Sequence, residues 1–267
     1  MTIALDYHTA KALLDWQIEL GATESIGDAP VDRYALAGVA PRAATPVAAQ
    51  AVSPAPAAQD PAHDRAHDPV AEARALAADV PDLEGLARVQ AAFDHCELKR
   101  GARNFVFADG DPLARVMIIG EAPGRDEDLQ ARPFVGRAGQ LLDRMLAAIG
   151  LARAAPDAER AVYITNILPW RPPQNRKPTK EECEMMLPFV ARHVDLAGPD
   201  LIVLMGNTPC GAILGQEGIT RIRGKWTEAF GRPALPMFHP AYLLRTPAAK
   251  REAWADLLSL QARLRKT

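Results

Sequence analysis

Residues Gly120–Leu142 read GEAPGRDEDLQARPFVGRAGQLL, and this stretch decides the fold. An apolar run, Val116–Ile119, precedes it and is typical of a buried parallel strand. Residues Ala138–Ile149 follow it with apolar side chains at helical spacing. A glycine- and proline-containing loop therefore lies at the carboxyl end of a strand, which is where open α/β sheets bind their ligands.

The rest of the C-terminal part alternates strands and helices in the same way. Apolar runs at 162–167, 200–206 and 234–238 predict further strands, and helical patterns lie between and after them. Such alternation implies parallel strands covered on both faces. We therefore expect an α/β fold with three layers, α/β/α, around a central, mainly parallel four-stranded sheet.

Three segments divide the chain. Residues 1–37 are predicted to form an N-terminal helical element, because apolar side chains recur at helical spacing within 9–20. Residues 38–70 are rich in alanine and proline and poor in large apolar side chains, so they predict a flexible linker. Residues 71–267 are expected to form the folded domain, and the helical element offers a docking segment for a partner protein.

Charge is unevenly distributed along the chain. The formal net charge is -2 over 267 residues, of which 48% are hydrophobic, enough for a sizeable core. Residues 221–267 nevertheless hold ten basic and three acidic side chains. This basic end favours a surface that faces a polyanion, although a solvated helix face explains the basic residues of 263–266 equally well.

Cysteine usage and the first residues suggest the compartment. Cys96, Cys183 and Cys210 are too few and too scattered for a disulfide framework and fit a reducing cytosol. We find neither a signal peptide nor an apolar run long enough to span a membrane. The expected localisation is cytoplasmic, close to the nucleoid, without membrane association.

The loop after the first strand combines small and acidic residues. Gly120 and Gly124 allow the backbone to turn and to approach a ligand closely. The acidic residues of the loop are Glu121, Asp126, Glu127 and Asp128. Compensation of a helix dipole explains each carboxylate taken singly, but it does not explain Phe134 followed by glycine in a polar loop.

Four stretches together resemble one known family. GEAPGRDED with RPFVGRAGQLL, then YITNILPWRPPQNR, TRIRGKW and MFHPAYLLR, are similar in sequence and order to the motifs of the family 4 uracil-DNA glycosylases. The resemblance covers the chain from about Phe93 to about Leu264. It implies the uracil-DNA glycosylase-like fold and a monofunctional enzyme of base excision repair that flips deoxyuridine out of DNA and hydrolyses its N-glycosidic bond, leaving an abasic site.

Three side chains are expected to hold the base. Phe134 is the candidate to stack on the uracil ring, with core packing as the alternative. Asn166 is the candidate to bind the O4 and N3–H edge, with a turn or cap as the alternative. His239, in FHPAYLLR, is the candidate to stabilise negative charge on the departing uracil, although an isolated histidine is more often structural.

The loop carboxylates are expected to assist the attacking water. The resemblance assigns the water to Glu127 and places the backbone around Glu121 against the base, and the two roles are open to exchange. Asn175 is expected to hold the water or the base. Backbone contacts to the base are further expected at Gly120, Ala122 and Gly124.

The remaining candidates are expected to contact DNA. The predicted phosphate contacts are Arg171, Arg176, Lys177, Arg221, Arg223 and Lys225. A wedge for the vacated base position, with its phosphate anchor, is predicted at Tyr242, Leu243, Leu244 and Arg245. Leucines at helical spacing usually belong to a core, so the wedge rests on the resemblance.

The chain departs from the family at one point. Family members commonly bind an iron–sulfur cluster through four cysteines, whose positions correspond here to Phe93, Cys96, Trp170 and Met186. Since only one thiol remains, we expect no cofactor and no metal, and an apolar plug in place of the cluster. The chain also lacks the Arg/His-rich insert of a related branch that captures the abasic product covalently.

Two other hypotheses are carried alongside. The first is a catalytically weak or inactive protein that binds uracil or abasic sites in DNA. The second is a phosphate-binding α/β domain, which the absence of GxxxxGK[ST] and of a complete GxGxxG disfavours. The expected partner is uracil-containing DNA, bound by a monomer.

Overall fold

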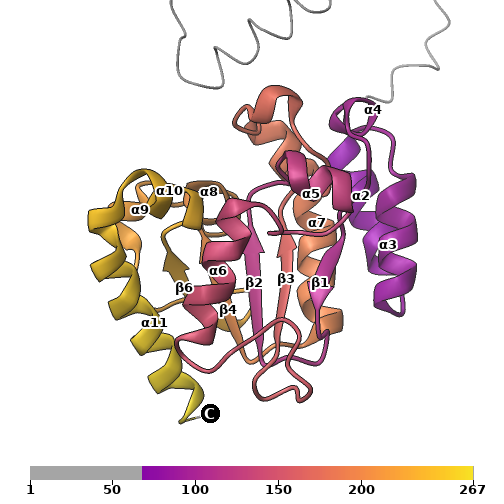
Figure 1. Cartoon of the computed structure of the whole chain (residues 1–267). Coiled ribbons are helices and arrows are strands. Elements are labelled where there is room, and N and C mark those ends of the chain that lie inside the picture. Colours follow the sequence, from indigo (N-terminus) through magenta and orange to yellow (C-terminus); the bar gives the residue numbers. More distant parts are fainter. Residues whose placement is uncertain (1–67, 267) are drawn as a thin grey trace, which may run out of the picture. The chain divides into compact units, whose positions relative to one another are not determined.

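A computed structural model describes residues 68–266 (Figure 1). The predicted helical element 1–37 and residues 38–67 of the predicted linker lie outside the described residues. Asp68 accepts hydrogen bonds from the backbone N–H groups of Val70 and Ala71 and thereby caps the first described helix. The helix begins at Pro69, two residues before the predicted domain boundary at Ala71.

The middle layer is a six-stranded sheet, in the order β1-β3-β2-β4-β6-β5, and not the predicted four-stranded one. Its four central strands are parallel, and a short antiparallel strand lies at each edge. The strands are β1 (Ala108–Gly110), β2 (Val116–Gly120), β3 (Val162–Asn166), β4 (Leu201–Met205), β5 (Thr227–Ala229) and β6 (Arg232–Met237). Every residue of β2, β3 and β4 is buried, as expected for strands covered on both faces.

Helices cover both faces of the sheet, so the predicted three-layer α/β/α fold is confirmed. The α-helices are α2 (Pro69–Ala78), α3 (Leu83–Ala92), α4 (Leu98–Gly101), α5 (Arg125–Gln130), α6 (Arg137–Ala147), α7 (Lys180–Ala197), α8 (Asn207–Leu214), α9 (Ile219–Ile222), α10 (Pro240–Arg245) and α11 (Lys250–Leu264), and the 3-10 helices are η2 (Pro173–Asn175) and η3 (Pro247–Ala249). In Figure 1, α6 and α11 lie in front of the sheet and α7 behind it. The helices α2 and α3 pack on α7, and α8 packs between α7 and β4.

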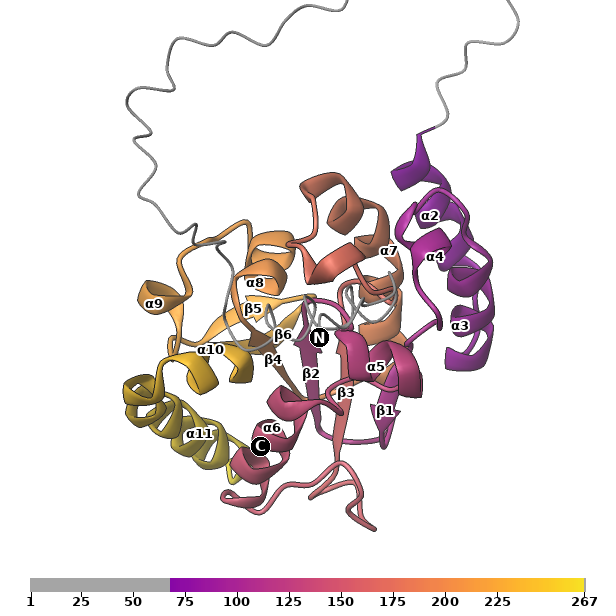
Figure 2. The same cartoon turned by 45° about the horizontal axis from the view of Figure 1, so that its top comes forward.

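The carboxyl ends of the four parallel strands meet at one edge of the sheet. Gly120, the last residue of β2, is in register with Asn166, the last residue of β3. His239 follows the end of β6 by two residues and caps α10. Figure 2 turns this edge toward the viewer. The topology therefore gathers loops that are up to 120 residues apart in sequence, which is the distance from Gly120 to the start of α10 at Pro240.

Within residues 68–266, no helix has both the length and the hydrophobicity needed to cross a membrane.

Candidate active site at the carboxyl edge of the sheet

Phe134 lies at the centre of this edge in a rare backbone conformation. Its φ is 53°, in the left-handed region, which bulky side chains seldom adopt and which costs about 1–2 kcal/mol. The side chain is only 5% exposed. Its ring lies against the His239 imidazole, with 5.3 Å between ring centroids and 30° between planes.

Two glycines make room for Phe134. A Cβ on Gly120 would lie 2.6 Å from the Phe134 ring and would also collide with Oδ1 of Asn166. A Cβ on Gly139, in the first turn of α6, would collide with the Phe134 carbonyl oxygen. Gly120 therefore allows the Phe134 ring and the Asn166 amide to converge on the end of β2.

Asn166 presents an uncommitted amide at this point. The residue is 6% exposed, yet its side chain forms no hydrogen bond with another residue of the described part of the chain. All buried side-chain nitrogen and oxygen atoms of that part have partners, so the amide of Asn166 must reach the surface of the site. Its donor and acceptor are thus free to pair with a ligand.

His239 has a defined tautomer. Its Nδ1 accepts a hydrogen bond of 3.1 Å from the backbone N–H of Ala241, so Nδ1 is unprotonated and Nε2 carries the hydrogen. Burial, with a smaller contribution from the positive charge of Arg245, lowers the pKa of His239 to about 4. The imidazole is therefore neutral at pH 7 and offers one Nε2–H donor.

Glu127 is largely occupied with backbone contacts. One carboxylate oxygen accepts from the N–H of Gly124 at 3.1 Å, and the other accepts from Val135 at 3.0 Å and Gly136 at 2.9 Å. A carboxylate has about four acceptor sites, so one remains. The carboxylate ties the loop after β2 to the loop that carries Phe134, a structural role that the sequence did not indicate.

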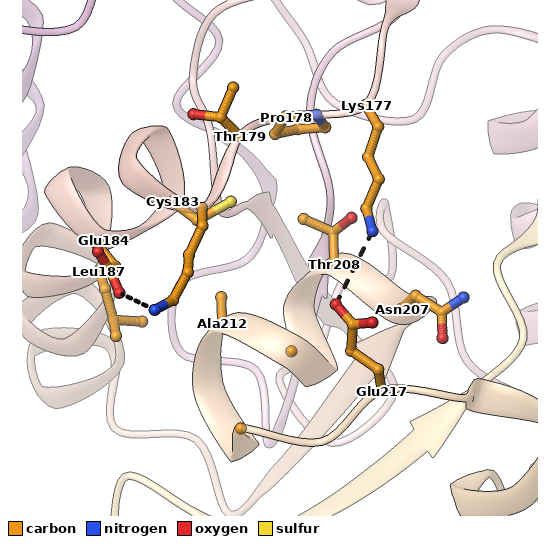
Figure 3. A pocket seen from close by; sticks show the side chains of 13 residues that line it. Lys177, Pro178, Thr179, Cys183, Glu184, Leu187, Asn207, Thr208, Ala212 and Glu217 are labelled. Atoms are coloured by element: carbon orange, nitrogen blue, oxygen red, sulfur yellow. Dashed lines mark ion pairs between the residues drawn. The ribbon is translucent and has the colours of Figure 1, made fainter.

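Glu121 has a different partner. Its carboxylate accepts a short hydrogen bond from the Thr208 hydroxyl at the start of α8. Thr208 also lines a cleft of about 430 Å³ between α7 and α8, where an ion pair joins Lys177 and Glu217 (Figure 3). Thr208 was missed in the sequence because a single threonine in GNTPCG gives no signal of its contact with a residue 87 positions away.

Asn175 does not join this group. It lies exposed in η2, and its Oδ1 accepts a hydrogen bond of 2.8 Å from Nε of Arg171. Its φ of 53° is left-handed, as asparagine tolerates in turns. The contacts of Asn175 in the structure therefore do not place it beside Phe134, Asn166 and His239, where we expected it to hold the base or the water.

The predicted phosphate contacts differ in their exposure and in their partners. Arg171 is half-buried and donates to Asn175. Lys177, Arg221 and Lys225 are exposed. Arg176 is also exposed, but its guanidinium forms two hydrogen bonds with Glu182, at 3.0 and 2.6 Å.

Arg223 differs from the other predicted phosphate contacts. Its side chain is 18% exposed and is paired with Asp256 of α11, with 2.7 Å from Nε to the carboxylate. Its guanidinium also lies 5.5 Å from the centroid of Phe238, next to His239. Because these contacts occupy the guanidinium, the structure does not present Arg223 as a phosphate contact, contrary to the sequence-based expectation.

The predicted wedge is divided by burial. Leu243 is 0% exposed and packs in the core, so the structure does not present it as a wedge, contrary to the sequence-based expectation. Tyr242 and Leu244 are half-buried, and Arg245 is exposed at the end of α10. The short helix turns one leucine of the pair inward and leaves the other near the surface.

Ala122 and Gly124 lie in the loop between β2 and α5. Gly124 is half-buried, and two carbonyl groups that precede it accept hydrogen bonds from residues just after β3. The backbone oxygens of Gly120 and Glu121 are engaged by the N–H groups of Ile167, at 2.9 Å, and Leu168, at 3.1 Å. This pairing fixes the loop against the end of β3.

The residues at the cluster positions do not fit an iron–sulfur cluster. Phe93, Cys96, Trp170 and Met186 are all buried, each at most 3% exposed, in one hydrophobic core. Phe93 packs edge-on against Phe189 with 5.4 Å between centroids, and Trp170 packs on Phe105 at 5.7 Å.

Two of the three thiols lie in or beside this core. Burial raises the pKa of Cys96, and it raises the pKa of Cys183 to about 11, so both thiols are protonated in the metal-free protein. Among residues 68–266 no group of three or more His, Cys, Asp or Glu side chains is arranged to hold a metal ion. A four-cysteine cluster thus has no donor set here.

Comparisons with known proteins agree with this geometry. A family model described as the uracil DNA glycosylase superfamily matches residues 107–258. Type-4 uracil-DNA glycosylases are similar to the chain: that of Archaeoglobus fulgidus is 38% identical over 183 residues, covering 65% of this chain and 89% of the relative. Those of Pyrobaculum aerophilum, 36% identical over 66% of this chain and 91% of the relative, and Thermotoga maritima, 38% over 56% and 77%, are further examples. The chain therefore belongs to the uracil DNA glycosylase superfamily and, by these relatives, to its type-4 family.

Proposed function

We propose that the protein is a monofunctional uracil-DNA glycosylase that flips deoxyuridine out of DNA and hydrolyses its N-glycosidic bond, leaving an abasic site for base excision repair. The observation that carries the proposal is the convergence of the Phe134 ring, the free Asn166 amide and the His239 imidazole at the carboxyl edge of the sheet. The type-4 names of the relatives support the same activity.

Binding of the base follows from these three groups. The flipped uracil stacks on Phe134, a type of contact worth about 1–3 kcal/mol per base. The Asn166 amide pairs with O4 and N3–H, and cytosine, which reverses this donor and acceptor pattern, leaves the amide unpaired at a cost of a few kcal/mol. Backbone contacts to the base come from Gly120, Ala122 and Gly124.

Hydrolysis depends on stabilising the charges that develop on the uracil and on the sugar as the N-glycosidic bond breaks. The neutral His239 donates its Nε2–H to O2 of the departing uracil, so the donor strengthens its bond as the oxygen becomes negative. Glu121 and the remaining acceptor site of Glu127 are the groups that orient water toward the sugar and stabilise its positive charge.

DNA binding uses the exposed cations around this edge. Lys177, Arg221, Lys225 and Arg245 contact phosphates, with half-buried Arg171 and, from its pair with Glu182, Arg176 contributing. Leu244 and Tyr242 fill the space that the flipped nucleotide vacates.

We further propose that residues 71–267 form the catalytic domain and that residues 1–37 and 38–70 act as a tethered helical element and linker. We propose that the enzyme works as a monomer. Its DNA substrate and its three unpaired thiols support a location in the cytoplasm near the nucleoid. A repair protein is the proposed partner of the N-terminal element.

The central test is incubation of the purified protein with single- and double-stranded oligonucleotides that contain one uracil, followed by alkali. Strand breaks at uracil, and not at thymine or cytosine, are expected. His239→Leu should lower the single-turnover rate by about 10²–10³-fold, the usual loss for one such donor. Tight binding of the uracil oligonucleotide without breaks would instead support the alternative, a protein that binds uracil or abasic sites without catalysis.

The excision rate should not follow the titration of an ordinary histidine. Because the pKa of His239 is lowered to about 4, the neutral donor persists on acidification. A histidine with a pKa of about 6.5 would lose about tenfold of its neutral form at about pH 5.5. We therefore expect no tenfold loss of the single-turnover rate from protonation of His239 between about pH 7.5 and about pH 5.5. If the wild-type rate falls tenfold over this range and the rate of His239→Leu does not, the assignment of His239 as a neutral donor is contradicted.

Glu127 and Glu121 should respond differently to removal of charge. In Glu127→Gln the side-chain NH₂ replaces one carboxylate oxygen and must face backbone N–H groups, either that of Gly124 or those of Val135 and Gly136. Because two donors then oppose each other, stability and activity should fall together. Glu121→Gln keeps an acceptor for Thr208, so it should lower kcat with little change in melting temperature. Melting curves and single-turnover rates check both, and an unchanged melting temperature for Glu127→Gln would argue against the loop tie.

We propose that the protein lacks the family's cluster and that the apolar plug takes its place. Protein purified without oxygen should be colourless and contain less than stoichiometric iron by elemental analysis, whereas a cluster would give about four irons per chain. Trp170→Ala should destabilise the protein by about 3–5 kcal/mol in chemical unfolding, because the indole is buried in the core. A brown protein with full iron content would refute the plug.

A further inference from the structure

Arg153 lies in the segment between α6 and β3 and reaches the backbone around Phe134. One of its terminal nitrogens donates to the Pro133 carbonyl at 3.0 Å, and the other donates to the Phe134 carbonyl at 2.8 Å. The guanidinium thus binds the two successive carbonyls that flank the nitrogen and the Cα of Phe134.

Two carboxylates hold the guanidinium from the other side. Asp143 of α6 accepts from Nε at 2.8 Å, and Asp109 of β1 accepts from a terminal nitrogen at 2.8 Å. The Arg153 side chain is 12% exposed and that of Asp109 is 17% exposed. Although burial raises the pKa of Asp109, hydrogen bonds from Arg132 and Arg153 bring the pKa below its ordinary value, so the carboxylate is charged.

This arrangement is more than a surface ion pair. Arg153 uses the fixed fork of its guanidinium to join β1, α6 and the loop of Phe134, a geometry that lysine does not reproduce. Phe134 has a left-handed backbone, with φ at 53°, that persists only where surrounding contacts impose it. Gly139, in the first turn of α6, leaves room for the Phe134 carbonyl oxygen because it has no Cβ, and Arg153 donates to the same oxygen.

We propose that Arg153, held by Asp109 and Asp143, is a positioning residue that fixes the left-handed turn at Phe134 and thereby sets the plane on which the flipped base stacks. This inference rests on the proposed function and deepens it, since Arg153 acts through Phe134 and does not touch the base. Loss of the fork lets the Phe134 ring turn away from His239 and the end of β2.

The test is a double-mutant cycle between Arg153 and Phe134. Arg153→Ala in the wild-type background should lower kcat/KM for a uracil oligonucleotide by about 10- to 100-fold, within the range for a misplaced binding group. Phe134→Gly removes the ring and adopts positive φ without strain, so adding Arg153→Ala to it should cause no further loss. Arg153→Lys should recover little, because it cannot make the paired contacts.

A matched control lies in the same segment. Among residues 68–266 the Arg160 side chain pairs only with Asp157, three residues away, and it is 64% exposed, so Arg160→Ala should leave the excision rate unchanged. If Arg153→Ala does not fold, Arg153→Lys and Asp109→Asn take its place in the cycle. An equal loss of activity in the wild-type and Phe134→Gly backgrounds would overturn the proposal, as would normal excision by a folded Arg153→Ala protein.

Failure of the proposed function is distinguishable from failure of this inference. If the wild-type protein shows no excision, the same four proteins are compared by chemical unfolding. The midpoint should fall more for Arg153→Ala in the wild-type background than in the Phe134→Gly background, because only phenylalanine needs the turn to be imposed. Equal shifts in the two backgrounds would show that Arg153 acts independently of Phe134.

Discussion

The left-handed turn at Phe134 is the constraint on which the candidate site depends. A phenylalanine seldom adopts this backbone, and here the contacts around it come from four separate segments: the end of β2, the first turn of α6, the Glu127 carboxylate and Arg153. The turn carries the ring over Gly120, where a side chain of any other residue would collide with it. Glycine is therefore needed at position 120 because the Phe134 ring approaches its backbone closely, and not because the loop must be flexible.

Hydrogen bonding separates the polar groups of the site into those that build it and those left for a ligand. Glu127 uses three of its acceptor positions for backbone amides, and Glu121 accepts from Thr208. The Asn166 side chain has no hydrogen-bonded partner among residues 68–266, and His239 uses Nδ1 locally while its Nε2–H remains. Groups that are already satisfied hold the loops, whereas the unsatisfied amide and imidazole are those that gain from binding a pyrimidine.

We propose that side-chain packing at the cluster positions replaces the metal bonds of the resembling family. Trp170 follows β3 and lies in the same buried core as Phe93 and Met186. Such contacts are individually weak, but a buried aromatic side chain contributes several kcal/mol through burial and ring packing. In our proposal they fix the loop that carries Arg171, Arg176 and Lys177 without any metal.

The sequence alone determined the layers, the parallel centre of the sheet and the three residues that meet at its edge. Apolar runs and helical spacing are local properties, so they identify β2, β3, β4 and the long helices without knowledge of neighbours. They missed α5, α9, α10 and β5, which are three to six residues long and too short to show a period. The motifs around Phe134, Asn166 and His239 indicated the family because their order is specific.

Only the tertiary structure decided what each side chain contacts. Arg223 is paired with Asp256 across 33 residues, Thr208 with Glu121 across 87, and Arg153 binds the Phe134 carbonyl across 19. The same packing buries Leu243 and leaves Leu244 near the surface. A residue type and its spacing determine which element it belongs to, but whether its polar atoms meet a partner or remain free depends on segments that only the folded chain brings together.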